Sequence, residues 1–74
     1  MNKKKEIIID IISKNTKIDS KVINEKSKMS EFSKWDSLCH LTIILELQKQ
    51  FKKNVNTSKM NDLNSVQKIF QFFE

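Results

Sequence analysis

The chain has 74 residues, with no glycine, no proline and a single cysteine. This length suffices for one small domain over residues 1–74, but its core would be too small to enclose a deep catalytic cleft as well, so we do not expect an enzyme. The lone Cys39 excludes an internal disulfide and a cysteine-based zinc cluster, and with a single histidine no metal-binding set is expected.

The net charge of +5 comes from fourteen lysines against nine acidic residues and would suit an anionic partner. However, the lysines are scattered, Lys3 to Lys5 is their only run, and the chain lacks arginine, whose bidentate fork reads bases and phosphates. A solvated lysine-rich surface is therefore the favoured interpretation. The alternative is a small basic helical module that binds nucleic acid through lysines and Trp35.

The chain shows no secretory pattern, and its apolar run over residues 7–12 is interrupted by Asp10 and too short to span a membrane. A single cysteine also agrees with a reducing compartment. We therefore expect a cytoplasmic monomer with neither a membrane nor nucleic acid as partner.

A first amphipathic helix is predicted from about residue 2 to residue 14. Its apolar face consists of isoleucines at helical spacing: Ile7, Ile8, Ile11 and Ile12. Ile9 falls off this stripe. A run of isoleucines could also form a buried strand, but the length and the charged flanks favour a helix.

Residues 15–34 form a polar, lysine-rich stretch in which apolar residues recur without a sustained period. A short helical turn near residues 19–23 is the only element expected there. A loop of about twenty residues is unusual in so small a domain.

A second helix is predicted from Ser37 to about Lys52. Apolar residues at Leu38, Leu41, Ile44, Leu45, Leu47 and Phe51 spread over more than half of its circumference. Because a single core seam needs only about 100° of apolar stripe, the excess indicates that this helix also offers apolar side chains to a partner or cargo. Leu38, Leu41 and Leu45 are the candidate partner contacts.

Two further helical segments are predicted after Val55. Asn56 or Thr57 can cap a short turn that runs through Met60, and Asn64, with Gln67 three residues later, can cap a last helix. The core face of this last helix would be formed by Val66, Ile69, Phe70 and Phe73. Phe70 and Ile44 lie centrally on the apolar arcs of their helices, so both are predicted core residues, and the fold class is all-α.

The start of the second helix is the candidate functional site. Asp36 is a good N-cap, since its carboxylate can accept a bond from a free backbone N–H and suits the positive end of the helix dipole. Ser37 then occupies the first helical position, where the unpaired N–H groups would favour a phosphate joined to its hydroxyl. By itself Asp36-Ser37-Leu38 is also ordinary helix-start chemistry.

The pattern downstream makes this tripeptide more informative. Asp36-Ser37-Leu38 is followed by apolar residues at Leu41, Ile44, Leu45, Leu47, Phe51, Val55, Met60, Leu63, Val66, Ile69, Phe70 and Phe73. In spacing and residue type the chain resembles the acyl carrier protein family, the phosphopantetheine-binding carrier domains, from about residue 7 to residue 73 and most firmly from Trp35 onward. The Trp-Asp-Ser-Leu-x-His-Leu pattern looks like that of stand-alone carriers in specialised pathways.

This resemblance implies a small four-helix bundle of acyl-carrier type, with three main helices, one short helix and a long first loop. Ile18, Val22, Met29 and Phe32 would pin that loop to the core. The resemblance also implies that Ser37 carries 4'-phosphopantetheine, on which an acyl or aminoacyl group travels as a thioester. The implied partners are a phosphopantetheinyl transferase and acyl-activating, synthase or transferase enzymes.

The chain departs from the family at three points. Many members have a glycine shortly before Asp-Ser-Leu and a proline after the position of Val55, and this chain has neither. Housekeeping fatty-acid carriers have a second helix rich in Asp and Glu, whereas this one ends in Lys49, Lys52 and Lys53. We therefore expect the protein to be a poor substrate for fatty-acid synthesis enzymes.

Three further side chains near Ser37 have a structural and a functional interpretation. Trp35 is expected to pack as a hydrophobic staple on the first turns of the helix, with a stacking platform as the alternative. His40 is expected to be a partly buried structural residue, not a base. For Cys39 an incidental small side chain is favoured over a reactive thiol.

Overall fold

The computed structural model describes residues 3–73, and within this range the fold is all-α, as predicted. Four α-helices follow one another as α1 (Lys3–Thr16), α2 (Ser37–Phe51), α3 (Thr57–Asp62) and α4 (Val66–Phe73). Two 3₁₀ turns, η1 (Ser20–Val22) and η2 (Met29–Glu31), interrupt the long first loop. The only β-type pairing among the described residues is one isolated antiparallel bridge between Lys28 and Ser65.

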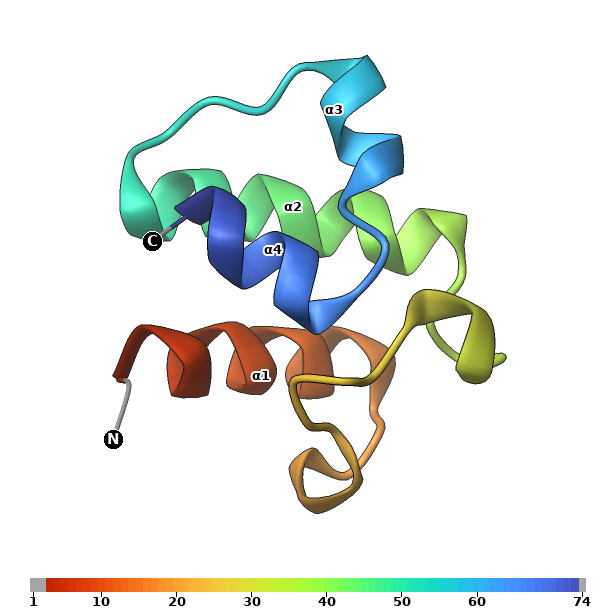
Figure 1. Cartoon of the computed structure of the whole chain (residues 1–74). Helices are drawn as coiled ribbons and strands as arrows, with labels where there is room; N and C mark the ends of the chain where they lie inside the picture. Colours follow the sequence, from red (N-terminus) through yellow and green to blue (C-terminus); the bar gives the residue numbers. More distant parts are fainter. Residues whose placement is uncertain (1–2, 74) are drawn as a thin grey trace.

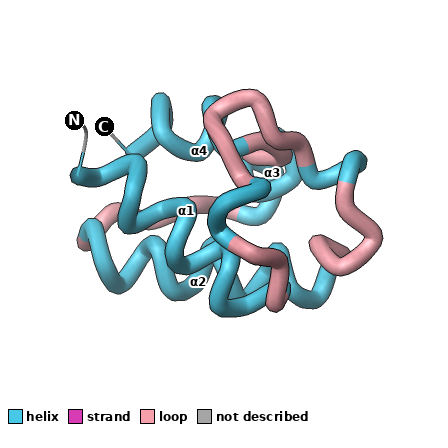
Figure 2. The backbone as a smooth tube through the Cα atoms, turned by 90° about the horizontal axis from the view of Figure 1, so that it is seen from below, coloured by secondary structure: helices cyan, strands magenta, loops and turns pink. Residues whose placement is uncertain are grey.

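Helix α1 packs against both α2 and α4, so the first and the last described helices lie against each other (Figure 1). A bond from Lys4 Nζ to the Phe73 carbonyl, 2.6 Å long, joins the first turn of α1 to the end of α4. The short α3 runs across the direction of α2 in Figure 1, and the tubes of α1 and α2 lie next to each other in Figure 2. Together the helices enclose one core.

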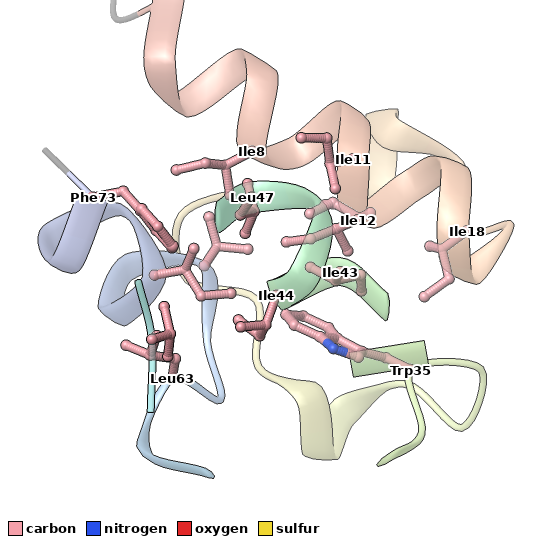
Figure 3. Close-up of a cluster of buried hydrophobic side chains, with 14 residues drawn as sticks. Ile8, Ile11, Ile12, Ile18, Trp35, Ile43, Ile44, Leu47, Leu63 and Phe73 are labelled. Carbon is pink, nitrogen blue, oxygen red and sulfur yellow. The ribbon is translucent and has the colours of Figure 1, made fainter. Parts of the chain in front are cut away.

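The core consists mainly of aliphatic side chains from α1, α2 and α4 (Figure 3). Its buried hydrophobic members are Ile8, Ile11, Ile12, Ile18, Ile23, Trp35, Ile43, Ile44, Leu47, Val55, Leu63, Val66, Ile69 and Phe73. The prediction for Ile44 is confirmed, since its side chain is fully buried. The prediction for Phe70 is wrong in degree: Ile69 is fully buried on α4, whereas Phe70 is half-buried at the edge, with the Lys5 ammonium 4.9 Å from its ring centroid.

The long first loop is pinned to the core, but one of its four predicted pins is wrong. Ile18 is buried and Met29 and Phe32 pack against the core, whereas Val22 is 55% exposed and Ile23 is buried instead. The physical reason is the predicted turn itself. Asp19 caps η1 by accepting a bond from the Lys21 N–H at 3.0 Å, and the chain leaves the turn extended at Ile23, which directs that residue inward.

Backbone hydrogen bonds fasten the loop to the beginning of α4. The Met29 N–H donates to the Asn64 carbonyl at 2.8 Å, and the Val66 N–H donates to the Ser27 carbonyl at 3.0 Å. Asn64 is therefore not the N-cap of α4 as predicted. Ser65 takes that role, because its hydroxyl oxygen accepts a bond from the Lys68 N–H at 3.2 Å. For α3 the sequence left Asn56 and Thr57 open as caps, and Asn56 is the one used, since its side chain accepts a 2.8 Å bond from the Lys59 N–H.

Candidate functional site

Asp36 caps the N-terminus of α2, as the sequence predicts. Its carboxylate accepts a bond from the Cys39 N–H at 2.9 Å, and its carbonyl accepts the N–H of His40 at 2.8 Å. The bond from the Cys39 backbone N–H is the main cause that lowers the pKa of the Asp36 carboxyl below its ordinary value of 3.8. The cap therefore stays ionised at neutral pH and holds the first turn of the helix.

Ser37 is the first residue of α2 and is exposed. At this position a serine hydroxyl lies at the mouth of the helix, where backbone N–H groups lack partners within the helix and the dipole favours negative charge. The geometry leaves the hydroxyl open to another protein. Ser37 is therefore accessible to a modifying enzyme.

Trp35 and His40 form a buried pair directly behind this helix start. Trp35 is 2% exposed and His40 is 5% exposed. The indole Nε1–H donates to Nδ1 of His40 at 3.0 Å, and the ring centroids are 5.9 Å apart. Since Trp35 precedes the cap and His40 is the fourth helical residue, the pair occupies the two positions of a hydrophobic staple, as predicted for Trp35.

The second ring nitrogen of His40 lies 3.0 Å from the Met60 carbonyl oxygen of α3. Burial lowers the pKa of His40 below its ordinary value of 6.5, against a smaller opposing effect of the Met60 carbonyl. The structural interpretation of His40 is thus supported, because both of its ring nitrogens have partners inside the protein. Sequence reasoning missed the bond between these two side chains.

Cys39 is half-buried, and its Sγ lies 3.5 Å from the carbonyl oxygen of Asn15. Burial is the main cause that raises the pKa of this thiol, and the neighbouring Asp36 carboxylate acts in the same direction. A thiol with a raised pKa is a weaker nucleophile at neutral pH because less of it is thiolate. This agrees with an incidental role for Cys39.

An exposed apolar stripe, formed by Leu38, Leu41 and Leu45, continues along α2 from Ser37. These three side chains are 73%, 40% and 50% exposed. Their spacing of three and then four residues puts them on one side of the helix. The buried side of α2 carries His40, Ile43, Ile44 and Leu47. The wide apolar arc seen in the sequence therefore divides into a core face and an exposed face.

The charges near this leucine stripe differ from those the sequence alone suggests. Glu46, the only acidic residue within α2, bonds to Lys14 and Asn15 of α1, and these bonds lower its pKa. Lys53 donates to the Phe72 carbonyl at 2.6 Å, and its ammonium lies 4.4 Å from the Phe72 ring centroid. Lys49 is exposed. The side of α2 that carries the leucine stripe therefore holds Lys49 but no carboxylate beyond Asp36.

A cleft of about 670 Å³ lies between the first loop and the beginning of α4, with Trp35 among its walls. Its other lining residues are Lys28, Met29, Ser30, Phe32, Asn64, Ser65 and Lys68. The low exposure of Trp35 contradicts its use as a stacking platform for a base. The alternative of a nucleic-acid-binding module therefore lacks the exposed aromatic side chain on which a base would stack.

Within residues 3–73 no group of three or more His, Cys, Asp or Glu side chains could hold a metal ion. Among the described helices, none has the length and apolar character that crossing a bilayer requires. No family model and no curated protein matches the chain.

Proposed function

We propose that this protein is a stand-alone carrier that holds an acyl or aminoacyl group on a 4'-phosphopantetheine arm joined to Ser37. The observation that carries the proposal is the exposed Ser37 at the first position of a capped helix, with the leucine stripe beginning at the next residue. A modifying enzyme needs both an accessible hydroxyl and a surface to hold. The start of α2 offers the two together.

In this proposal the residues of the chain have distinct roles. The Ser37 hydroxyl oxygen bonds to the phosphorus nearest the pantetheine of coenzyme A, and the bond from that phosphorus to the rest of the pyrophosphate breaks. Adenosine 3',5'-bisphosphate leaves, the hydroxyl proton is released, and Ser37 becomes part of a phosphodiester. Asp36 orients the first helical turn, and Leu38, Leu41 and Leu45 contact the transferase and later enzymes. When bound, the arm supplies a thiol that carries the cargo as a thioester.

Catalysis belongs to the partner enzymes, and the carrier contributes delivery. Covalent tethering keeps the cargo at a high effective concentration near each partner site, which free diffusion would not do. This role requires a small, stable protein with one modifiable side chain and one docking surface. A cytoplasmic location is part of the proposal.

Incubation with a phosphopantetheinyl transferase and coenzyme A should add one phosphopantetheinyl group per chain, measured by intact mass. Trypsin cuts after Lys34 and Lys49, so the group should appear on the peptide of residues 35–49, whose only serine is Ser37. Fragmentation must place it on Ser37 and not on Cys39 or Thr42. An unmodified chain with several such enzymes would refute the proposal.

The charge of α2 leads to a prediction about partner choice. Enzymes of housekeeping fatty-acid synthesis dock on carriers with acidic second helices, and bringing like charges together at an interface can cost several kcal/mol. We expect the loaded wild type to be elongated slowly, and the double variant Thr42→Glu/Lys49→Glu to be elongated faster, most clearly at low salt. Lys53 is left unchanged because it is bonded to α4.

The matched control for this prediction is Lys3→Glu/Gln67→Glu. It changes the net charge by the same amount at two exposed positions outside α2. Equal elongation rates for the two double variants would show that the net charge of the protein, and not the charge of α2, determines the gain. Fast elongation of the wild type, with no gain in either variant, would assign partner choice to the leucine stripe alone.

A further inference from the structure

We infer that His40 is a pH-dependent positioning residue: its neutral ring holds Trp35 behind the start of α2, and its protonation releases Trp35 and loosens the segment that presents Ser37. The effect on Ser37 rests on the proposed carrier function. The bond between the two rings stands independently of it.

The two hydrogen bonds of His40 determine where its proton lies. The indole Nε1–H of Trp35 can only donate, so the Nδ1 atom at 3.0 Å must be the unprotonated acceptor. The Met60 carbonyl can only accept, so the Nε2 atom at 3.0 Å must carry the proton. This arrangement requires the neutral ring with its proton on Nε2. A second proton on Nδ1 would place two donors against each other.

The pair joins three parts of the fold. Trp35 lies near the end of the long first loop, and its backbone N–H donates to the Phe32 carbonyl at 3.1 Å. His40 belongs to α2, and Met60 belongs to α3. Trp35 and His40 are both buried, so the indole N–H cannot turn to water without a shift of the chain. Asp36 and Ser37 directly follow Trp35. A shift of Trp35 is therefore transmitted to the cap and to the serine.

Few charged groups close to His40 could change its proton affinity. Asp36, the cap of α2, lies four residues before His40, and its carboxylate is bonded to the Cys39 N–H. Further along α2, Glu46 is partly buried and bonded to Lys14 and Asn15 of α1, and Lys49 is exposed. The charged residues of the segments beside the pair are exposed: Lys28, Glu31 and Lys34 in the first loop, Lys59 and Asp62 on α3, and Lys68 on α4. Burial, opposed by the Met60 carbonyl, is what shifts the proton affinity of His40.

The pH range follows from the direction of the shift. The pKa of His40 is lowered below its ordinary 6.5, so the unfolded chain binds its proton before the folded protein does. The stabilisation by neutral His40 is complete above pH 6.5 and falls as the pH drops from there towards the folded-state pKa. The carboxyls of Asp36, Glu25 and Glu46 have pKa values lowered from 3.8 and 4.5, so their stabilisation is complete above those ordinary values and is lost only at lower pH, outside the range of His40.

Nuclear magnetic resonance tests the pair directly, since the chain has one tryptophan and one histidine. At neutral pH the ring nitrogen shifts of His40 should show Nε2 protonated and Nδ1 bare. On acidification the indole N–H resonance of Trp35 should move with the same midpoint as the His40 ring, below 6.5. The inference would be overturned by a Trp35 indole N–H shift that does not change as His40 titrates, or by a proton on Nδ1 at neutral pH.

The matched variants are His40→Gln and His40→Leu. Glutamine supplies one acceptor and one donor without titrating, whereas leucine supplies neither. In His40→Gln the indole N–H should remain hydrogen-bonded and lose its pH dependence over the same range, and in His40→Leu the bond should be lost at every pH. If glutamine and leucine behave alike, the hydrogen bond does not position Trp35.

Loading of Ser37 completes the test. The rate for His40→Gln divided by that for the wild type, with one transferase at each pH, removes the enzyme's own pH dependence. This ratio should rise several-fold as the pH falls below 6.5, while circular dichroism shows both proteins folded. A flat ratio would refute the link to Ser37. Absence of loading in both proteins at every pH would instead refute the carrier function, and the resonance experiment would still decide on the pair.

Discussion

Replacing Ser37 with alanine is expected to abolish phosphopantetheine loading completely and to leave the fold intact. The proposed phosphodiester needs the serine oxygen, and alanine has none. Ser37 is exposed, the Asp36 cap bonds to the Cys39 N–H and not to Ser37, and alanine is a good helix former. The change in unfolding free energy should therefore stay within about 0.5 kcal/mol. Intact mass and circular dichroism measure the two effects.

Two comparison variants separate attachment from positioning. Ser33→Ala removes an exposed hydroxyl four residues earlier and should load like the wild type. Asp36→Ala removes the helix cap, so loading should slow but still reach one group per chain. Modification of the Ser37→Ala protein under the same conditions would refute the assignment of the attachment site.

The second large effect is expected in the core, where Ile44→Ala should destabilise the protein by about 2–5 kcal/mol. Ile44 is fully buried between α2 and the rest of the core, so its truncation leaves a cavity. Small domains have only about 5–15 kcal/mol of total stability, and this one has few residues with which to form a core. A large part of the protein should therefore unfold at physiological temperature.

The neighbouring residue provides the matched control. Leu45 is 50% exposed on the same helix, so Leu45→Ala removes a similar group from the surface and should cost about 0.5 kcal/mol. Phe70→Ala should fall between the two, because Phe70 is half-buried. Urea unfolding followed by circular dichroism gives the three values. Equal losses for Ile44→Ala and Leu45→Ala would show that the two faces of α2 are assigned incorrectly.

The local features of the fold were predictable from the sequence. Asp36 and Asn56 precede helical segments, and each accepts the backbone N–H three residues later, because capping depends only on the cap residue and the first turn. The helical spacing of the isoleucines likewise predicts α1. The exposed position of Ser37 follows from its place directly after a cap. All of these depend on contacts within one or two turns of the chain.

Only the tertiary structure decided which apolar residues are buried. The apolar arc of α2 is wider than one core face, and the packing of α1 and α4 determined that Ile43, Ile44 and Leu47 are covered while Leu41 and Leu45 remain exposed. A periodic pattern identifies an apolar side chain but not the side from which a neighbour approaches. For the same reason Ile23 replaced Val22 as a pin of the loop.

The long-range contacts around Ser37 could also not be predicted from the sequence, because they join residues far apart in the chain. Lys14 is 32 residues from Glu46, and Met60 is 20 residues from His40. No local pattern predicts that Glu46 turns towards α1, which leaves the leucine stripe without an acidic neighbour on that side. The sequence determined a capped serine on an amphipathic helix, since caps and periodicity are local. The charges beside the leucine stripe and the Trp35–His40 bond depend on helices that a common core brings together. Only the tertiary structure decided them, because burial depends on the whole chain.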